Sequence, residues 1–181
     1  MATPGIRKLT YADYVRIPED GNRHEILGGE EFVTPAPDVG HQRASRKLQA
    51  HLDRHVTEHQ LGEVFDAPID IVLSDADIVQ PDLLFVTRER SHIIGEKNIQ
   101  GAPDLVVEIL SPSTQTVDRT VKREAYERAG VREYWIVDRA ARVVEVHLFG
   151  ATRHHVVHGE NGILRSELLP GLEIRIADIL G

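Results

Sequence analysis

The chain has 181 residues, 41% of them hydrophobic, and a formal net charge of −8. This length suits one globular domain, and we expect residues 1–181 to fold as a single unit without metal or disulfide support. The absence of cysteine excludes disulfides, thiolate zinc sites and a cysteine nucleophile, and the acidic balance excludes a general attraction to phosphate backbones. The N-terminus has no apolar signal-peptide core and no segment has the length of a spanning helix, so we expect a cytoplasmic protein with no membrane partner.

The first elements predicted along the chain are a short helix and a hairpin. Thr10 is a plausible N-cap residue with Asp13 three positions later, and Pro18 would end any helix that begins there. The stretch RHEILGGEEFVTP reads as a β-hairpin that turns at Gly28-Gly29.

A long amphipathic helix is predicted over residues 39–59. Apolar side chains recur there every four positions, at Ala44, Leu48, Leu52 and Val56. A row of histidines, His51, His55 and His59, follows the same spacing. Two such histidines can bind zinc, but no Glu or Cys completes the set, and half-exposed residues on a polar face are the better interpretation. His41, at the start of this helix, has either a supporting role at a site or a capping role.

The middle of the chain is rich in strand signals. EVFDAPIDIVL and DIVQPDLLFV are strand-like and are separated by a polar turn, whereas PDLVVEIL is a near-continuous apolar run, typical of a strand in the middle of a sheet.

Residues 103–138 then read as a strand-helix-strand unit with a parallel crossover. The predicted helix runs from Val117 to a stop at Gly130. Its inward face carries Asp118, Val121, Lys122, Ala125, Tyr126 and Ala129. The strand VREYWIVD follows.

A second hairpin, turning near Gly150-Ala151, and a short closing segment IADIL complete the chain. The histidines of this hairpin, His154, His155 and His158, are expected at the surface. The fold class is therefore α/β, with a mixed central sheet flanked by helices and with N-terminal and C-terminal β-hairpins.

Glu108 is the unusual residue of the buried run LVVEIL, because an ionised carboxylate there needs a cationic partner. A salt bridge to a buried Arg or Lys, or a strand end that reaches solvent, would also explain it. Asp104 lies four residues earlier, roughly 13 Å away at about 3.3 Å per residue, which is too far to share one Mg²⁺. Asp82 could share an ion with Glu108 if their strands are neighbours. Asp104 is then a turn or capping residue.

Lys122 lies on the inward face of the predicted helix, where a lysine needs an anionic partner. One interpretation is a structural ion pair with Asp118, one turn earlier. The other is that its ammonium approaches Asp82 and Glu108, where it would orient an attacking water or neutralise a phosphate.

Taken together, these pieces resemble the PD-(D/E)XK nuclease superfamily, which has the restriction endonuclease-like fold, and within it the Uma2 family of putative restriction endonucleases. The resemblance covers nearly the whole chain and rests on RHEILGGEEF, PAPDVGHQRASRKLQAHL, IVQPDLLFV, GAPDLVVEILSPST, DRTVKREAYERAGVREYWIVD and LPGLEI.

The resemblance implies a metal site. Asp82 and Glu108 match its acidic ligands for Mg²⁺, or alternatively Mn²⁺, and the backbone carbonyl of Ile109 would be a further ligand. Glu25 matches an acidic residue that faces the same metal in related nucleases. Leu110 stands where the superfamily motif has its lysine, and Lys122 matches the lysine that the family has moved to the following helix.

The implied function is a metal-dependent endonuclease that hydrolyses DNA phosphodiester bonds, with Lys122 orienting the attacking water. Cleavage of both strands usually takes two sites, so a homodimer is expected. The alternative is a catalytically inactive member of the fold that binds a protein or a nucleic acid.

Overall fold

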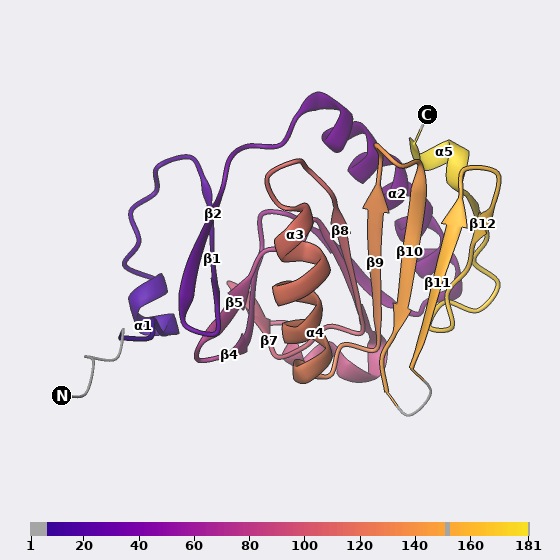
Figure 1. The fold of residues 1–181 in the computed structure, drawn as a ribbon. Helices are drawn as coiled ribbons and strands as arrows, with labels where there is room; N and C mark the ends of the chain where they lie inside the picture. Colours follow the sequence, from indigo (N-terminus) through magenta and orange to yellow (C-terminus); the bar gives the residue numbers. More distant parts are fainter. Residues whose placement is uncertain (1–6, 151–152, 181) are drawn as a thin grey trace.

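The computed structural model describes residues 7–150 and 153–180, which form two mixed sheets with helices packed on them (Figure 1). The larger sheet has the strand order β11-β10-β9-β8-β6-β3, with bounds His154–Gly159, Val143–Leu148, Glu133–Asp138, Leu105–Ile109, Leu83–Thr87 and Gly62–Asp66. In this sheet β8 and β9 run parallel and the other neighbouring pairs are antiparallel. The predicted α/β class and the parallel crossover are therefore confirmed.

A second sheet contains the N-terminal hairpin. Its order is β2-β1-β5-β4-β7, with bounds Glu30–Thr34, Arg23–Leu27, Asp77–Val79, Asp70–Ser74 and Asn98–Gln100. The sequence predicted one central sheet, but the chain crosses between two sheets at Pro68 and at Pro81, each of which separates consecutive strands. Proline cannot donate a ladder hydrogen bond, so each strand ends there.

The predicted N-terminal helix and hairpin are both present. Helix α1 spans Tyr11–Tyr14, and the Asp13 carboxylate accepts from the backbone N–H and the hydroxyl of Thr10. The β1–β2 hairpin turns at Gly28 and Gly29, whose φ values of 61° and 81° lie in the left-handed region that glycine adopts without strain.

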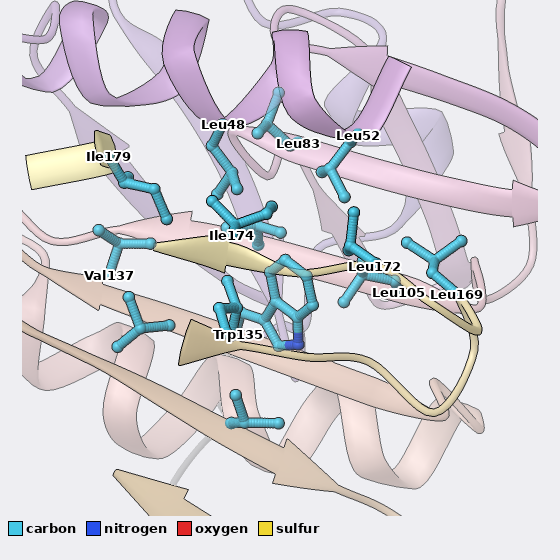
Figure 2. Close-up of a cluster of buried hydrophobic side chains, with 14 of the residues drawn as sticks. Leu48, Leu52, Leu83, Leu105, Trp135, Val137, Leu169, Leu172, Ile174 and Ile179 are labelled. Atoms are coloured by element: carbon cyan, nitrogen blue, oxygen red, sulfur yellow. The ribbon is translucent and has the colours of Figure 1, made fainter. Parts of the chain in front are cut away.

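Helix α2 (Val39–His59) covers one face of the six-stranded sheet. All four residues of its predicted apolar stripe are buried. Figure 2 shows Leu48 and Leu52 of this helix above Trp135, with Leu172 and Ile174 of the C-terminal segment beside the indole. This segment adds the short strands β12 (Ile163–Leu164) and β13 (Ile174–Arg175) and helix α5 (Ile176–Leu180).

The opposite face of the six-stranded sheet packs on the five-stranded sheet and on the helix that follows β8. A 3-10 helix, Arg88–Ile93, also contributes to this core. Figure 1 places α2 and α4 (Arg123–Ala129) on opposite sides of the larger sheet.

The helix after β8 has a π-helical turn near its start. It comprises α3 (Gln115–Val117), the π turn Asp118–Lys122 and α4 (Arg123–Ala129), and it ends at Gly130 with a φ of 94°. The wider π turn keeps Asp118 and Lys122 buried but rotates Val121 outward. The prediction that Val121 faces inward is therefore wrong, since this side chain is 38% exposed.

The C-terminal hairpin pairs β10 with β11 as predicted. Ala151, at the predicted turn position, lies outside the described residues. Within the described ranges, no helix combines the length and the apolar character needed to cross a membrane.

Candidate active site

Neighbouring strands bring Asp82 and Glu108 together. Strands β6 and β8 are antiparallel, and Leu83 pairs with Val107. Continuing this register by one residue puts Asp82 opposite Glu108. Both side chains are buried on the sheet face that packs against α4, because residues 84 and 106, two positions away along each strand, belong to that core.

The Asp82 carboxylate is held from three sides. Its Oδ1 accepts from the Arg23 guanidinium at 3.1 Å and 3.2 Å. Its Oδ2 accepts from the backbone N–H of Ile109 at 2.8 Å and lies 3.0 Å from Nε2 of His41. Burial alone would raise the pKa of Asp82, but His41, Arg23 and the Ile109 N–H together lower it. Asp82 is therefore ionised at neutral pH.

Lys122 contacts three carboxylates. Its Nζ lies 2.8 Å from Glu25, 3.0 Å from Glu108 and 3.5 Å from Asp118, and its side chain is only 3% exposed. Lys122 thus pairs with Asp118, as the first interpretation states, and reaches Glu108, one of the two acids of the second interpretation. Burial acts to lower the pKa of Lys122, but these carboxylates raise it above the ordinary value, so the ammonium keeps its charge.

Glu108 has a different electrostatic environment from Asp82. Its Oε1 accepts from Lys122 and, at 2.7 Å, from the hydroxyl of Tyr126. Burial raises the pKa of Glu108 to about 8, and the carboxylates of Asp118, Asp82 and Glu25 add to this effect while Lys122 opposes it. Without a further cation, burial therefore favours the protonated form of Glu108.

The site has an excess of negative groups. Four buried carboxylates, Glu25, Asp82, Glu108 and Asp118, face the two permanent cations Arg23 and Lys122. This surplus adds to the effect of burial in raising the pKa of Glu108. It is also the charge that one divalent cation would neutralise.

A cavity of about 200 Å³ opens beside these groups. Water occupies about 30 Å³ per molecule in the liquid, so the cavity has room for a hydrated ion. Its lining includes the polar side chains of Arg23, His41, Asp82, Glu108, Asp118 and Lys122.

Asp118 and Ile109 complete the set of groups that could hold a cation. Asp118 is buried, and its Oδ1 has no hydrogen-bond partner among the described residues. Ile109 also lines the cavity. Glu25 is not among the lining residues, and its two oxygens contact the backbone N–H of Gln80 and the ammonium of Lys122. Oxygen ligands of this kind suit Mg²⁺, so the residues fit such an ion.

The second Pro-Asp dipeptide lies elsewhere. Asp104 precedes β8, where its carboxylate accepts from the backbone N–H of Thr87 at 2.9 Å and from Arg90 at 3.0 Å. Asp104 thus connects the start of β8 to the segment around Thr87 and Arg90, and it does not line the cavity. Leu110, at the position of the superfamily lysine, is buried in the core.

The histidine row of α2 makes ordinary hydrogen-bond contacts, but His55 is buried, so the prediction of a half-exposed residue is wrong there. Nε2 of His55 lies 3.1 Å from the carbonyl of Pro170, and Nδ1 of His59 lies 2.9 Å from the carbonyl of His55. His51 contacts Arg54. Among the described residues, the row does not form a three-ligand metal group.

Sequence reasoning missed three groups at the site. Arg23 and Tyr126 contact the two central acids, and Asp118 was considered only as a partner of Lys122. Arg23 is 59 residues from Asp82, so no local pattern connects them. The alignment of Tyr126 with Lys122 on one helical face was the available signal for the tyrosine.

Comparisons with known proteins identify the family and support the fold. A family model, Uma2, described as "Putative restriction endonuclease", matches residues 11–177. The crystal structure of a putative nuclease belonging to DUF820 from Anabaena variabilis superposes with a TM-score of 0.78 and 18% sequence identity, over 95% of this chain and 97% of that one. At this identity the likeness concerns the fold. No curated protein matches the sequence.

Proposed function

Because this chain belongs to the Uma2 family of putative restriction endonucleases, we propose that it is a metal-dependent endonuclease that hydrolyses DNA phosphodiester bonds. The observation that carries the proposal is the convergence of Asp82, Glu108 and Lys122 on one cavity with surplus negative charge.

Asp82 and Glu108 would hold Mg²⁺ or Mn²⁺, with the backbone carbonyl of Ile109 as a further ligand and Asp118 as an additional candidate. When bound, the ion lowers the pKa of a coordinated water and neutralises charge that develops on the phosphate. Binding would release the proton of Glu108. The ion would also offset the negative charge of the site, which would otherwise repel an anionic substrate. Such an offset matters because the chain has a net charge of −8.

Lys122 would act as a fixed positive charge. Its ammonium can donate hydrogen bonds to an attacking water or to a phosphate oxygen, but a lysine with a raised pKa cannot accept the proton of that water. Its role in the proposal is thus to orient the nucleophile and stabilise charge. Glu25 would position Lys122 through their 2.8 Å contact instead of binding the metal directly.

The test is plasmid cleavage in Mg²⁺ or Mn²⁺ with near-isosteric variants. Asp82→Asn, Glu108→Gln and Lys122→Met should each reduce cleavage by a factor on the order of 100 or more. Asp104→Asn is the matched control, because Asp104 belongs to the other Pro-Asp dipeptide and does not line the cavity. Its cleavage activity per folded molecule should equal that of the wild type.

Absence of metal-dependent cleavage by the wild type, or activity that survives all three site changes, would contradict the proposal. Binding of DNA without cleavage would favour the alternative of an inactive binding module. A homodimer and a cytoplasmic location stay predictions. Light scattering with and without a DNA duplex tests the first.

A further inference from the structure

A basic groove lies beside the candidate active site. One wall is the exposed face of α2, with Gln42, Arg43, Arg46 and Gln49, and the other wall includes Asp66 at the end of β3. Its volume is about 550 Å³. We call this surface the α2 groove. The proposed metal chemistry does not use it.

Both walls of the α2 groove begin next to Asp82. On the helix side, Nε2 of His41 lies 3.0 Å from Oδ2 of Asp82. On the strand side, Asp66 pairs with Leu83, and the backbone N–H of Ala67 donates to the carbonyl of Asp82 at 3.1 Å. The groove therefore starts at the catalytic cavity and leads away from it along α2.

The two arginines of the groove carry charge that the protein itself does not neutralise. Arg43 and Arg46 are exposed, and neither forms an ion pair with any described residue. By contrast, Arg165 at another surface pairs with Glu173 at 2.7 Å. Asp66 is the only acid among the residues that line the groove, so the groove has a net positive charge within a chain of net charge −8. Such a local excess attracts an external anion.

The basic character of α2 is confined to the half of the helix that adjoins the cavity. Residues 39–52 contain no Asp or Glu, and the first acidic residue of the helix is Asp53. Gln42 and Gln49 add neutral side chains that can donate hydrogen bonds to phosphate oxygens. The guanidinium groups of the two arginines match the geometry of phosphate oxygens better than a lysine ammonium would.

The spacing along α2 suits a nucleic-acid backbone. Arg43 and Arg46 follow His41 by two and five residues, which places them about 3 Å and about 7.5 Å further along the helix axis. A DNA strand advances about 3.4 Å along the duplex axis for each phosphate. The two arginines thus lie within about two phosphate steps of the histidine that contacts Asp82.

We infer that the α2 groove binds the backbone of the DNA duplex next to the scissile phosphate, with Arg43 and Arg46 contacting phosphate oxygens. The inference rests on the proposed function, because it takes the cavity as the place of the scissile phosphate. Backbone contacts of this kind supply affinity and fix the position of the duplex, but they do not read the base sequence. The groove would therefore hold the substrate, while the cavity carries out the chemistry.

The test is the affinity for a short fluorescent duplex, measured by anisotropy at several salt concentrations with Ca²⁺ in place of Mg²⁺. Gel electrophoresis checks that the duplex stays intact. The double variant Arg43→Gln/Arg46→Gln should bind on the order of 10-fold more weakly or worse near physiological salt. Its slope of log Kd against log salt concentration should decrease by about 1.8, or about 0.9 for each lost phosphate contact.

Cleavage kinetics give a second readout. Neither arginine lines the cavity, so the single-turnover rate in Mg²⁺ at saturating protein should equal that of the wild type. The protein concentration needed for half the maximal rate should rise as the Kd does. Both side chains are exposed, so the fold should be unaffected.

Arg88→Gln/Arg165→Gln is the matched control, because it removes the same charge at other surfaces. Arg88 follows β6 at the end opposite Asp82, and neither residue lines the cavity or the α2 groove. This variant should bind the duplex as the wild type does.

The possible outcomes separate the groove from the chemistry. Wild-type protein that does not bind the duplex, a groove variant that binds as tightly as the wild type, or an equal loss in the control would overturn the inference. If the groove variant loses affinity but the wild type does not cleave, the groove stands as a DNA contact and only the nuclease chemistry fails. A groove variant with an altered oligomeric state in light scattering and unchanged DNA affinity would mean that a second copy of the chain occupies the groove, which also overturns the inference.

Discussion

Replacing Glu108 with glutamine should change how the stability of the metal-free protein depends on pH. Burial raises the pKa of Glu108 from 4.5 to about 8, so the folded chain keeps a proton that the unfolded chain has lost. The contribution of Glu108 to stability is therefore complete below the unfolded-state pKa and decreases as the pH rises toward 8. Each pH unit in that interval removes about 1.4 kcal/mol, so the loss over the whole interval is about 5 kcal/mol, of which about 4 kcal/mol falls above pH 5.

Urea unfolding in EDTA, from about pH 5 to about pH 9, measures this effect as the difference in free energy of unfolding between the wild type and Glu108→Gln. The difference should move in favour of the variant by on the order of 4 kcal/mol as the pH rises. A difference that is constant with pH, or that moves toward the wild type, would refute the reasoning.

Asp104→Asn provides a control with the opposite electrostatics. Burial acts to raise the pKa of Asp104, but the backbone N–H of Thr87 and the Arg90 guanidinium hold it below its usual value. The contribution of Asp104 to stability is thus fully present above its unfolded-state pKa and is lost only as the pH falls through the folded-state value. The difference between wild type and Asp104→Asn should stay constant over the same pH range.

Other changes give separate expectations. Because binding must displace the Glu108 proton, the affinity for Mg²⁺ should rise by about tenfold per pH unit up to about pH 8, as measured by calorimetry. Tyr126→Phe removes a buried hydrogen bond to Glu108 and should lower the free energy of unfolding by about 1–2 kcal/mol in urea. Leu48→Ala should cost about 2–5 kcal/mol in the same assay, because Leu48 is fully buried in the core around the indole. Gly62→Ala would bring a Cβ into steric conflict with the backbone carbonyl oxygen of Val86, so it should destabilise the protein far more than Gly21→Ala, whose Cβ meets open space.

The periodicity of apolar residues predicted individual helices and strands, because each of these elements depends on residues that are close in the sequence. The four-residue repeat from Ala44 to Val56 predicted α2 with its observed bounds, because one apolar stripe must face a core. The apolar run around Glu108 predicted a central strand, and strand spacing alone favoured Asp82 over Asp104 as its neighbour.

The pairing of strands that are distant in the sequence could not be predicted. Strands β5 and β7 have three residues each, and too few side chains specify which sheet they join. The π turn at Asp118 has no distinct periodicity in so short a segment, and it rotated Val121 away from its predicted face. The contacts of Glu145 with His147 and His155 depend on the register of β10 against β11, which residue types alone do not determine.

The contact of Lys122 with the acids joins two layers of the molecule. Asp82 and Glu108 are carried by the sheet, whereas the ammonium reaches Glu108 from the π turn that precedes α4. Transient detachment of residues 115–129 would withdraw the cation while the strands stay paired. The chain would then pass through a form that is still folded but chemically incomplete. Amide exchange in this helix, not global unfolding, would therefore report the temperature at which the site loses its lysine.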